Sequence, residues 1–344
     1  MRIVSVAAAP ADVVNLAPVR RALAASPDVE QLILHTGRPD SPGMAAAMDA
    51  MELPPVEHHL EVGAGPDGIQ TGLMLQRLEP VLTELQPDFV LAYGDGNAAT
   101  AAALAAAKLG LRVAHVEAGL RSGDRSPAEI NRVVTDRLAD PLFVPSRDAI
   151  DALKAEGVAE ERIQFVGSVR IDALCWALAR APAVDAGAYA VATLHEPAAE
   201  VVQALAELDR RLPVVTAPVG YLQLIGLVAG AALVITDTDE LQEETSYLGV
   251  PCITLRSSTD HPATCQHGTN RLVAAGRLTL LAAADRALAR RAPARPVLER
   301  WDGRAAERIA RVLCDGTDFP AEPAQTAAPD ARPTRRAVAI PQMA

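Results

Sequence analysis

Short apolar runs alternate with longer amphipathic segments along most of the chain. Six runs of β-branched and aliphatic residues occupy residues 2–8, 30–36, 56–62, 88–93, 112–116 and 142–144. Five more occupy residues 163–166, 189–194, 213–216, 232–236 and 251–255. The segments between these runs are rich in Ala and Leu and have the apolar spacing of helices. This alternation predicts βα repeats around parallel sheets, that is, an α/β fold.

A break near Gly167 and Ser168 separates the two sets of predicted strands. We expect a Rossmann-like, doubly wound domain at residues 1–167 and a second at residues 168–319, facing one another across a central cleft. Residues 320–344 are rich in Pro, Ala, Thr and Arg without an apolar period, which predicts a flexible tail. Ligands of such sheets bind at the carboxyl ends of the strands, so candidate site residues are sought there.

Composition narrows the class of function. The 344 residues include 32 Lys and Arg against 43 Asp and Glu, a net charge of −11. An acidic surface repels phosphate backbones and anionic lipid, so nucleic-acid binding and membrane binding are not expected. The four cysteines form no CxxC pair, which argues against a disulfide framework and a zinc site. With no long apolar run and no signal segment, the sequence predicts a soluble, cytoplasmic protein.

Polar side chains gather where the predicted strands end. Asp95 follows one strand in YGDGNAAT, and Glu117 follows a neighbouring one in HVEAGLRSGD. One carboxylate in such a place more often caps the next helix. Two in one cleft would instead suit acid/base chemistry on the two faces of a carbon. His195 and Thr238 end two strands of the second set, although a histidine there is about as often structural.

Several longer stretches occur in the order that is typical of one enzyme family. They are GDGNAATAAALAA, HVEAGLRSGD, SPAEINRVVTDRLAD, FVGSVRIDAL, TLHE, VITDTDELQEETSYLGVPCITLR and HGTNRLV. In these the chain resembles, from about residue 3 to about residue 313, the non-hydrolysing UDP-N-acetylglucosamine 2-epimerases. The resemblance implies a GT-B-like pair of Rossmann-like domains, a homodimer, and an isomerase that removes and returns a proton at a sugar carbon while UDP leaves and returns.

The resemblance also implies roles for particular residues. Asp95 and Glu117 become the acid/base carboxylates, and His195 becomes a catalytic residue near the pyrophosphate. Glu244 matches the group that holds the ribose. The residues expected to bind substrate are Arg121, Glu129, Asn131, Arg132, Thr238, Glu244, Arg256 and Arg271. No cofactor and no metal is expected.

The departures from the family pattern concern mainly the nucleotide site. Residues 8–11 lack the arginine that faces the diphosphate, and Ala128 stands where the family has a catalytic carboxylate. Residues 238–240 read Thr-Asp-Glu in place of a Ser-Gly-Gly turn, and Glu196 replaces an arginine. Between residues 213 and 220 the second domain is shorter than the family pattern by about one βα unit.

These departures lead to three hypotheses about the substrate. Carboxylates beside a diphosphate disfavour its binding, so the leading hypothesis is an epimerase of a smaller phosphorylated keto-sugar, such as fructose 6-phosphate. Arg121, Arg132, Arg256 or Arg271 would then hold the phosphate. One alternative is a UDP-GlcNAc/UDP-ManNAc 2-epimerase. The other is a catalytically inactive sugar-nucleotide-binding homologue, which the missing carboxylate at Ala128 favours.

Overall fold

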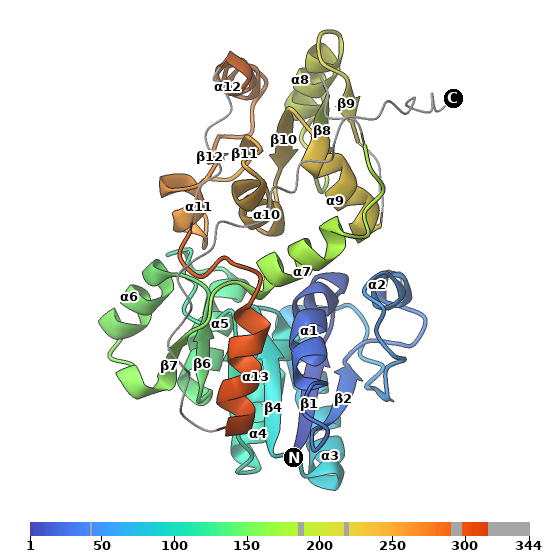
Figure 1. Ribbon diagram of the computed structural model, residues 1–344, viewed down its shortest axis with the longest axis vertical. Helices are drawn as coiled ribbons and strands as arrows, with labels where there is room; N and C mark the ends of the chain where they lie inside the picture. The colour runs from blue at the N-terminus through green and yellow to red at the C-terminus, as the bar shows by residue number, and fades with distance from the viewer. Residues whose placement is uncertain (42, 185–188, 217–219, 290–297, 316–344) are drawn as a thin grey trace. The chain divides into compact units, whose positions relative to one another are not determined.

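A computed structural model of the protein describes residues 1–41, 43–184, 189–216, 220–289 and 298–315. The chain divides into two compact units, each an α/β unit with its own parallel sheet. The first unit contains Met1–Ala173 and the segment that starts at Glu299, and the second contains Leu174–Leu298. The predicted α/β fold with two doubly wound sheets is therefore confirmed (Figure 1).

Within the described residues, the first unit has a seven-stranded parallel sheet with strand order β3-β2-β1-β4-β5-β6-β7. Its strands are β1 (Arg2–Ala7), β2 (Glu30–His35), β3 (His58–His59), β4 (Phe89–Tyr93), β5 (Val113–Val116), β6 (Leu142–Val144) and β7 (Ile163–Phe165). The order reverses direction between β1 and β4. Such a switch point leaves room for a ligand at the carboxyl ends of the two strands.

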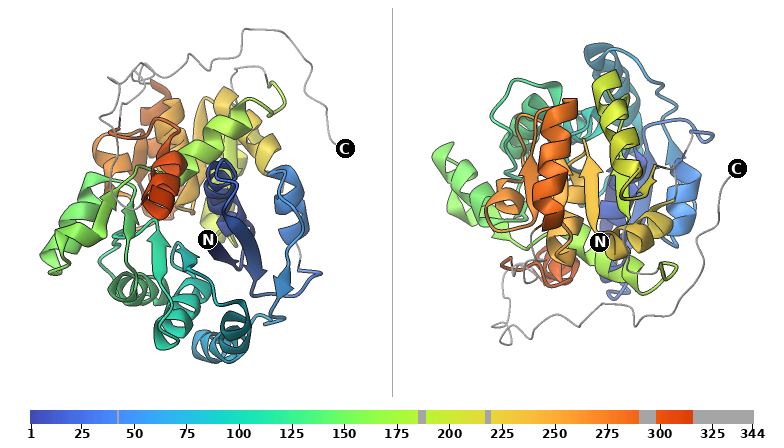
Figure 2. Two further views of the ribbon diagram at one scale, coloured as in Figure 1. Left: turned by 60° about the horizontal axis from the view of Figure 1, so that its bottom comes forward. Right: turned by 90° about the horizontal axis from the view of Figure 1, so that it is seen from above.

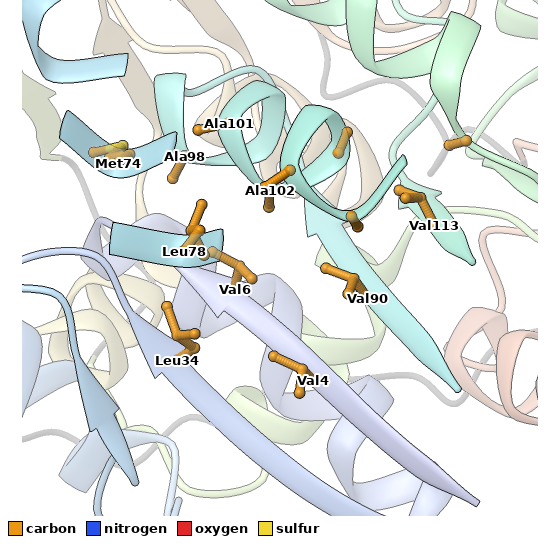
Figure 3. Close-up of a cluster of buried hydrophobic side chains, with 14 of the residues drawn as sticks. Val4, Val6, Leu34, Met74, Leu78, Val90, Ala98, Ala101, Ala102 and Val113 are labelled. Atoms are coloured by element: carbon orange, nitrogen blue, oxygen red, sulfur yellow. The ribbon is translucent and has the colours of Figure 1, made fainter. Parts of the chain in front are cut away.

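Helices cover both faces of this sheet. The helices of this unit are α1 (Pro10–Leu23), α2 (Met44–Ala50), α3 (Asp67–Leu85), α4 (Asn97–Lys108), α5 (Pro127–Leu138), α6 (Arg147–Ala155), the 3₁₀ turn η1 (Glu160–Arg162), α13 (Ala305–Asp315) and the first half of α7 (Val169–Leu178). On one face, Val4 and Val6 of β1 pack with Leu78 of α3 and Ala102 of α4 (Figure 3). The small alanines let α4 lie close to the sheet. Because helices cover both faces of the sheet, its central strands are apolar on both faces.

The second unit repeats the plan with five parallel strands among its described residues, in the order β12-β11-β10-β8-β9. Its strands are β8 (Ala190–Thr193), β9 (Val214–Val215), β10 (Leu233–Thr236), β11 (Cys252–Thr254) and β12 (Asn270–Leu272). The switch point of this sheet lies between β8 and β10, which both precede polar loops. The geometry again places a candidate site at the carboxyl ends of two neighbouring strands.

Two apolar clusters hold this second sheet between layers of helices. The helices are α8 (Ala199–Asp209), α9 (Tyr221–Gly230), α10 (Glu240–Leu248), α11 (Pro262–Gln266) and α12 (Arg277–Ala289). Val201 of α8 and Leu280 of α12 belong to the cluster on one face, where Figure 2 shows the two helices side by side. Val228 of α9 and Leu241 of α10 belong to the cluster on the other face.

The predicted strands agree with the structure except at two places. The run at residues 56–62 forms only the two-residue strand β3, and β12 was not predicted. Strand β12 is short and carries polar Asn270 and Arg271, so it has no apolar run to reveal it. The tail predicted at residues 320–344 lies outside the described residues. No helix in the described part of the chain is long and apolar enough to cross a membrane.

The division into units differs from the predicted boundary at residue 167. It falls inside α7, after Ala173, and the chain rejoins the first unit at Glu299, so α13 packs beside α1. Asp172 of α7 accepts hydrogen bonds from the backbone N–H groups of Ala305 (3.1 Å) and Ala306 (2.7 Å) at the start of α13. These N–H groups have no partner within the helix, so Asp172 caps α13 from elsewhere in the sequence.

Asp172 gives the first testable prediction. Burial raises the pKa of its carboxyl to about 7, because the charged form is costly away from water. A raised acid pKa adds stability below pH 4 that is lost as the pH rises toward 7. We expect the wild type to lose about 2 kcal/mol of unfolding free energy relative to Asp172→Asn between pH 5 and pH 8, measured by urea unfolding. Equal pH slopes, or the same change in the exposed Asp49→Asn control, would contradict this.

Candidate functional site

Two carboxylates follow neighbouring central strands of the first sheet. Tyr93 at the end of β4 pairs with Val116 at the end of β5, so Asp95 and Glu117 lie at the same edge. The backbone of Glu117 is in the left-handed region, with φ of +67°. Such a conformation is rare and strained for a residue other than glycine and concentrates at functional sites. The structure thus brings together the two residues that the sequence selected as acid/base carboxylates.

The first turns of α5 hold the Asp95 loop. The guanidinium of Arg132, which is 6% exposed, forms an ion pair with Asp95 and contacts Glu129 at 3.4 Å. The side-chain amide of Asn131 donates to the backbone carbonyl of Asp95 at 2.9 Å and to Asn97 at 3.0 Å. Three residues that the sequence assigned to substrate binding, Glu129, Asn131 and Arg132, therefore bond to the protein itself around Asp95.

A buried charge network lies behind this edge of the sheet. His115 of β5 donates to Asp136 of α5 (2.6 Å) and to the carbonyl of Gly94 (2.8 Å), which directly precedes Asp95. Arg121 completes the network through Asp136 (2.8 Å) and Glu156 (2.7 and 2.9 Å). Arg121 was expected to bind substrate, but the structure engages its guanidinium with two carboxylates of the same unit. A phosphate would have to compete with both.

The segment after β1 contributes two residues that the sequence analysis did not select. Asp12 in the first turn of α1 accepts from the N–H groups of Ala8 (2.8 Å) and Ala9 (2.9 Å), and burial raises the pKa of its carboxyl. One turn further, Asn15 donates from its side-chain amide to Glu117 at 2.6 Å. Asp12 and Asn15 are three positions apart, so they lie on the same face of α1. This spacing of two polar residues in an otherwise apolar segment is the sequence signal that could have selected them.

A pocket of about 810 Å³ opens beside the Asp95 loop, within the first unit. Gly96, Asn97 and Ala98 line it at the start of α4, Ala8 lines it after β1, and Gln70 of α3 lines it beside Asn97, from which it accepts a hydrogen bond of 2.8 Å. Further lining residues come from the loops after β2 and β3, at Thr36, Gly37, Arg38, Asp40, Ser41, Val62, Gly63 and Ala64. The pocket lies at the switch point of this sheet and has the size of a small-molecule site.

His195 and Asp237 form a pair at the switch point of the second sheet. His195 follows β8 and Asp237 follows β10, and Asp237 accepts from the backbone N–H of His195 (2.8 Å) and from its Nδ1 (3.1 Å). The His195 side chain is 82% exposed, so Nε2 faces outward while the carboxylate fixes the ring. Thr238 turns back onto Thr236 through a bond of 3.1 Å from its backbone N–H. Asp237 was in the predicted strand-end motif but was not selected.

The carboxylate of Asp239 is paired in the second unit. It forms an ion pair with Arg256 and accepts from Gln242 at 2.8 Å. Burial, together with nearby Asp260, raises the pKa of Asp239 even though Arg256 lies beside it. Burying the ion pair of Asp239 and Arg256 therefore has a desolvation cost. The expectation that Asp239 meets a diphosphate as an uncompensated charge therefore does not hold for this carboxylate. Arg256, expected to hold phosphate, is its partner.

Glu244 and Arg271, the other residues of the second unit that were predicted to bind substrate, form hydrogen bonds within that unit. Glu244 of α10 is 1% exposed and accepts from the hydroxyl of Tyr221 at 2.9 Å. Arg271 donates to the carbonyl of Cys265 at 2.9 Å. Among the described residues, no group of three or more His, Cys, Asp or Glu side chains has the arrangement of a metal site.

The sequence matches one protein-family description over most of its length. The family, described as UDP-N-acetylglucosamine 2-epimerase, matches at residues 21–216 and 189–314. The UDP-N-acetylglucosamine 2-epimerase of Methanocaldococcus jannaschii is 33% identical over 362 residues, which cover 89% of this chain and 96% of that one. The UDP-2,3-diacetamido-2,3-dideoxy-D-glucuronate 2-epimerase of Pseudomonas aeruginosa is 34% identical over 316 residues, covering 80% and 89%.

The fold is also similar to a solved structure from the same group. The crystal structure of the M. jannaschii UDP-GlcNAc 2-epimerase in complex with UDP-GlcNAc and UDP superposes with a TM-score of 0.82 at 32% identity. The match covers 92% of this chain and 100% of that chain. Similarity in both sequence and fold therefore extends over both units.

Proposed function

The chain belongs to the UDP-N-acetylglucosamine 2-epimerase family, whose members are isomerases, and on that premise we propose that it inverts C2 of a UDP-linked 2-acetamido sugar. Removal and return of the C2 proton would be the work of Asp95 and Glu117. A homodimer and a cytoplasmic location stay predictions from the resemblance.

One observation carries the proposed chemistry. Asp95 and Glu117 end neighbouring strands, and each is held by a side chain of a different helix, Asp95 by Arg132 of α5 and Glu117 by Asn15 of α1. Two carboxylates held at one edge of a sheet can act as a pair, one giving a proton while the other takes one. Inversion at a carbon needs such a pair, because the proton leaves one face and returns to the other.

The contacts of the arginines favour a nucleotide sugar over a keto-sugar phosphate. The keto-sugar hypothesis needs Arg121, Arg132, Arg256 or Arg271 to hold a phosphate, and the first three are engaged by carboxylates of the protein. The objection to a diphosphate rested partly on Asp239, which Arg256 neutralises. Both relatives described above are named for UDP-linked substrates.

We predict that the wild type incorporates solvent deuterium at C2 of UDP-GlcNAc and none at fructose 6-phosphate, followed by NMR in deuterated water. UDP alone should raise the melting temperature, because a ligand that binds only the folded protein stabilises it. Exchange with fructose 6-phosphate alone would overturn the proposed substrate class. UDP stabilisation without exchange in any sugar would support the inactive, sugar-nucleotide-binding alternative that Ala128 suggests.

A further inference from the structure

The side chain of Glu117 is held by the turn after β4 and by α1. Gly94 in that turn has φ of +63°, and a Cβ placed on it would lie 3.8 Å from Oε2 of Glu117. The N–H of Gly94 donates to the carbonyl of Val116 at 3.2 Å, which keeps the turn against the end of β5. Glu117 also has a positive φ, so its backbone has left the extended conformation of β5. Its side chain is therefore not bound to the alternating side-chain directions of a strand.

Asn15 reaches Glu117 from a buried position on α1. It is 5% exposed, and its Nδ2 donates to Oε2 of Glu117 at 2.6 Å. The carbonyl oxygen Oδ1 of the same amide is buried and accepts no hydrogen bond from the described residues. An unsatisfied buried acceptor costs stability, so it calls for an explanation beyond folding.

We propose that Asn15 is the positioning residue of Glu117 and that its amide serves both protonation states of that carboxylate. This inference rests on the proposed function. In the ionised state, Nδ2 donates to Oε2. When Oε2 carries a proton it becomes a donor, and the amide, turned over, offers Oδ1 as acceptor. The unsatisfied Oδ1 is then the acceptor needed by the other half of the reaction.

Glu117 takes part in the proton transfer at C2 of the sugar. The C2–H bond of the sugar breaks and its proton passes to Glu117. The electron pair forms a C1–C2 double bond as the C1–O bond to UDP breaks, and UDP leaves with the electrons of that bond. In the return step Asp95 gives a proton to the opposite face of C2, the double-bond electrons form the new C2–H bond, and UDP adds back at C1. Proton exchange with solvent then restores both carboxylates. The amide of Asn15 can accompany this change, because its Nδ2 donates to the ionised carboxylate and its Oδ1 can accept from the protonated one.

The test uses Asn15→Leu, which removes both hydrogen-bonding groups at similar volume, and Asn15→Asp, which differs from asparagine by one group and adds a charge. For exchange at C2 of UDP-GlcNAc we expect Asn15→Leu to lower kcat at least tenfold with KM within threefold. Asn15→Asp should move the acidic limb of the kcat pH profile up by at least one unit, because a like charge disfavours ionised Glu117. Melting curves identify variants that fold; if Asn15→Leu does not, Asn15→Asp carries the test.

The charged groups on neighbouring elements are the same in wild type and variants, so differences report Asn15. They include Asp12 on α1, Asp95 after β4, Glu129 and Arg132 on α5, and Arg170 on α7, whose charge acts on Asp12. Ala22→Ser, on the same helix, is the control and should leave kcat and the pH profile unchanged. If the wild type exchanges its proton and both Asn15 variants keep the wild-type kcat and pH profile, the inference fails alone. If the wild type exchanges with no sugar, the proposed function fails, and the inference with it.

Discussion

Asp95→Asn and Glu117→Gln are each expected to lower deuterium exchange at C2 of UDP-GlcNAc by a factor of about 10³ or more. Each change removes a group that gives or takes the proton in the transition state, and general acid–base catalysis contributes about 10²–10⁴-fold for one such group. The amides keep the size of the carboxylates and can still accept from Arg132 and Asn15. The loss should therefore appear in kcat, with the melting temperature little changed.

The exposed carboxylate of Glu79 on α3 supplies a matched control. Glu79→Gln removes the same charge from an exposed position on α3 and should exchange deuterium at the wild-type rate. Wild-type exchange in Asp95→Asn or in Glu117→Gln would show that the acid/base assignment is wrong for that residue. A collapse of the melting temperature in either would move its role from catalysis to structure.

Asp136→Asn is expected to lower the free energy of unfolding by about 3–5 kcal/mol at pH 7, the cost of breaking a buried ion pair on one side. Asp136 is 1% exposed and accepts from His115, from Arg121 and from the backbone N–H of Gly119 at 3.2 Å. An amide carries no charge to compensate the buried guanidinium of Arg121, and it offers one acceptor oxygen in place of two. Urea unfolding of the wild type and of Asp136→Asn gives the difference in unfolding free energy. Asp151→Asn, at an exposed position on α6, is the control.

The same residue gives a pH dependence of definite sign. Burial alone would raise the pKa of Asp136, but His115 and Arg121 outweigh burial and hold the pKa below its ordinary value of 3.8. A lowered acid pKa adds stability above pH 4, which is lost as the pH falls through the folded-state pKa. The gap between wild type and Asp136→Asn should narrow below pH 4. A constant gap from pH 7 to pH 3 would mean that the charge of Asp136 is not its source.

The sheet strands could be predicted because buried parallel strands are continuous apolar runs. Ten of the eleven predicted runs become strands of comparable position. The central strands β4 and β5 are buried along their whole length, so their runs are apolar at every position except His115. Strand β12 and helix α13 show the limit of this argument. Asn270 in β12 is buried, and its side chain forms hydrogen bonds with Gln242 and Thr254. The start of α13 is capped by Asp172, which lies 133 residues before Ala305. Local periodicity carries no information about either contact.

The sequence predicted the sheet edge at which the candidate site lies, but it did not predict the hydrogen-bond partners of the site residues. Strand ends indicated Asp95, Glu117 and His195, because the topology of a parallel sheet fixes where such residues gather. The partners could not be predicted, since Asn15 lies 102 residues from Glu117 in the sequence. Nor does an arginine in a motif reveal whether it faces a ligand or a carboxylate of the protein, as Arg121 illustrates.

The position of α13 bears on the order in which the protein folds during synthesis. The ribosome makes Met1–Ala173, then the whole second unit, and only then the helix that packs beside α1 and is capped by Asp172. The nascent first unit therefore keeps one flank of α1 uncovered until the second unit and α13 have been made. Emergence of α13, rather than emergence of Met1–Ala173, is the event that completes the core of the first unit.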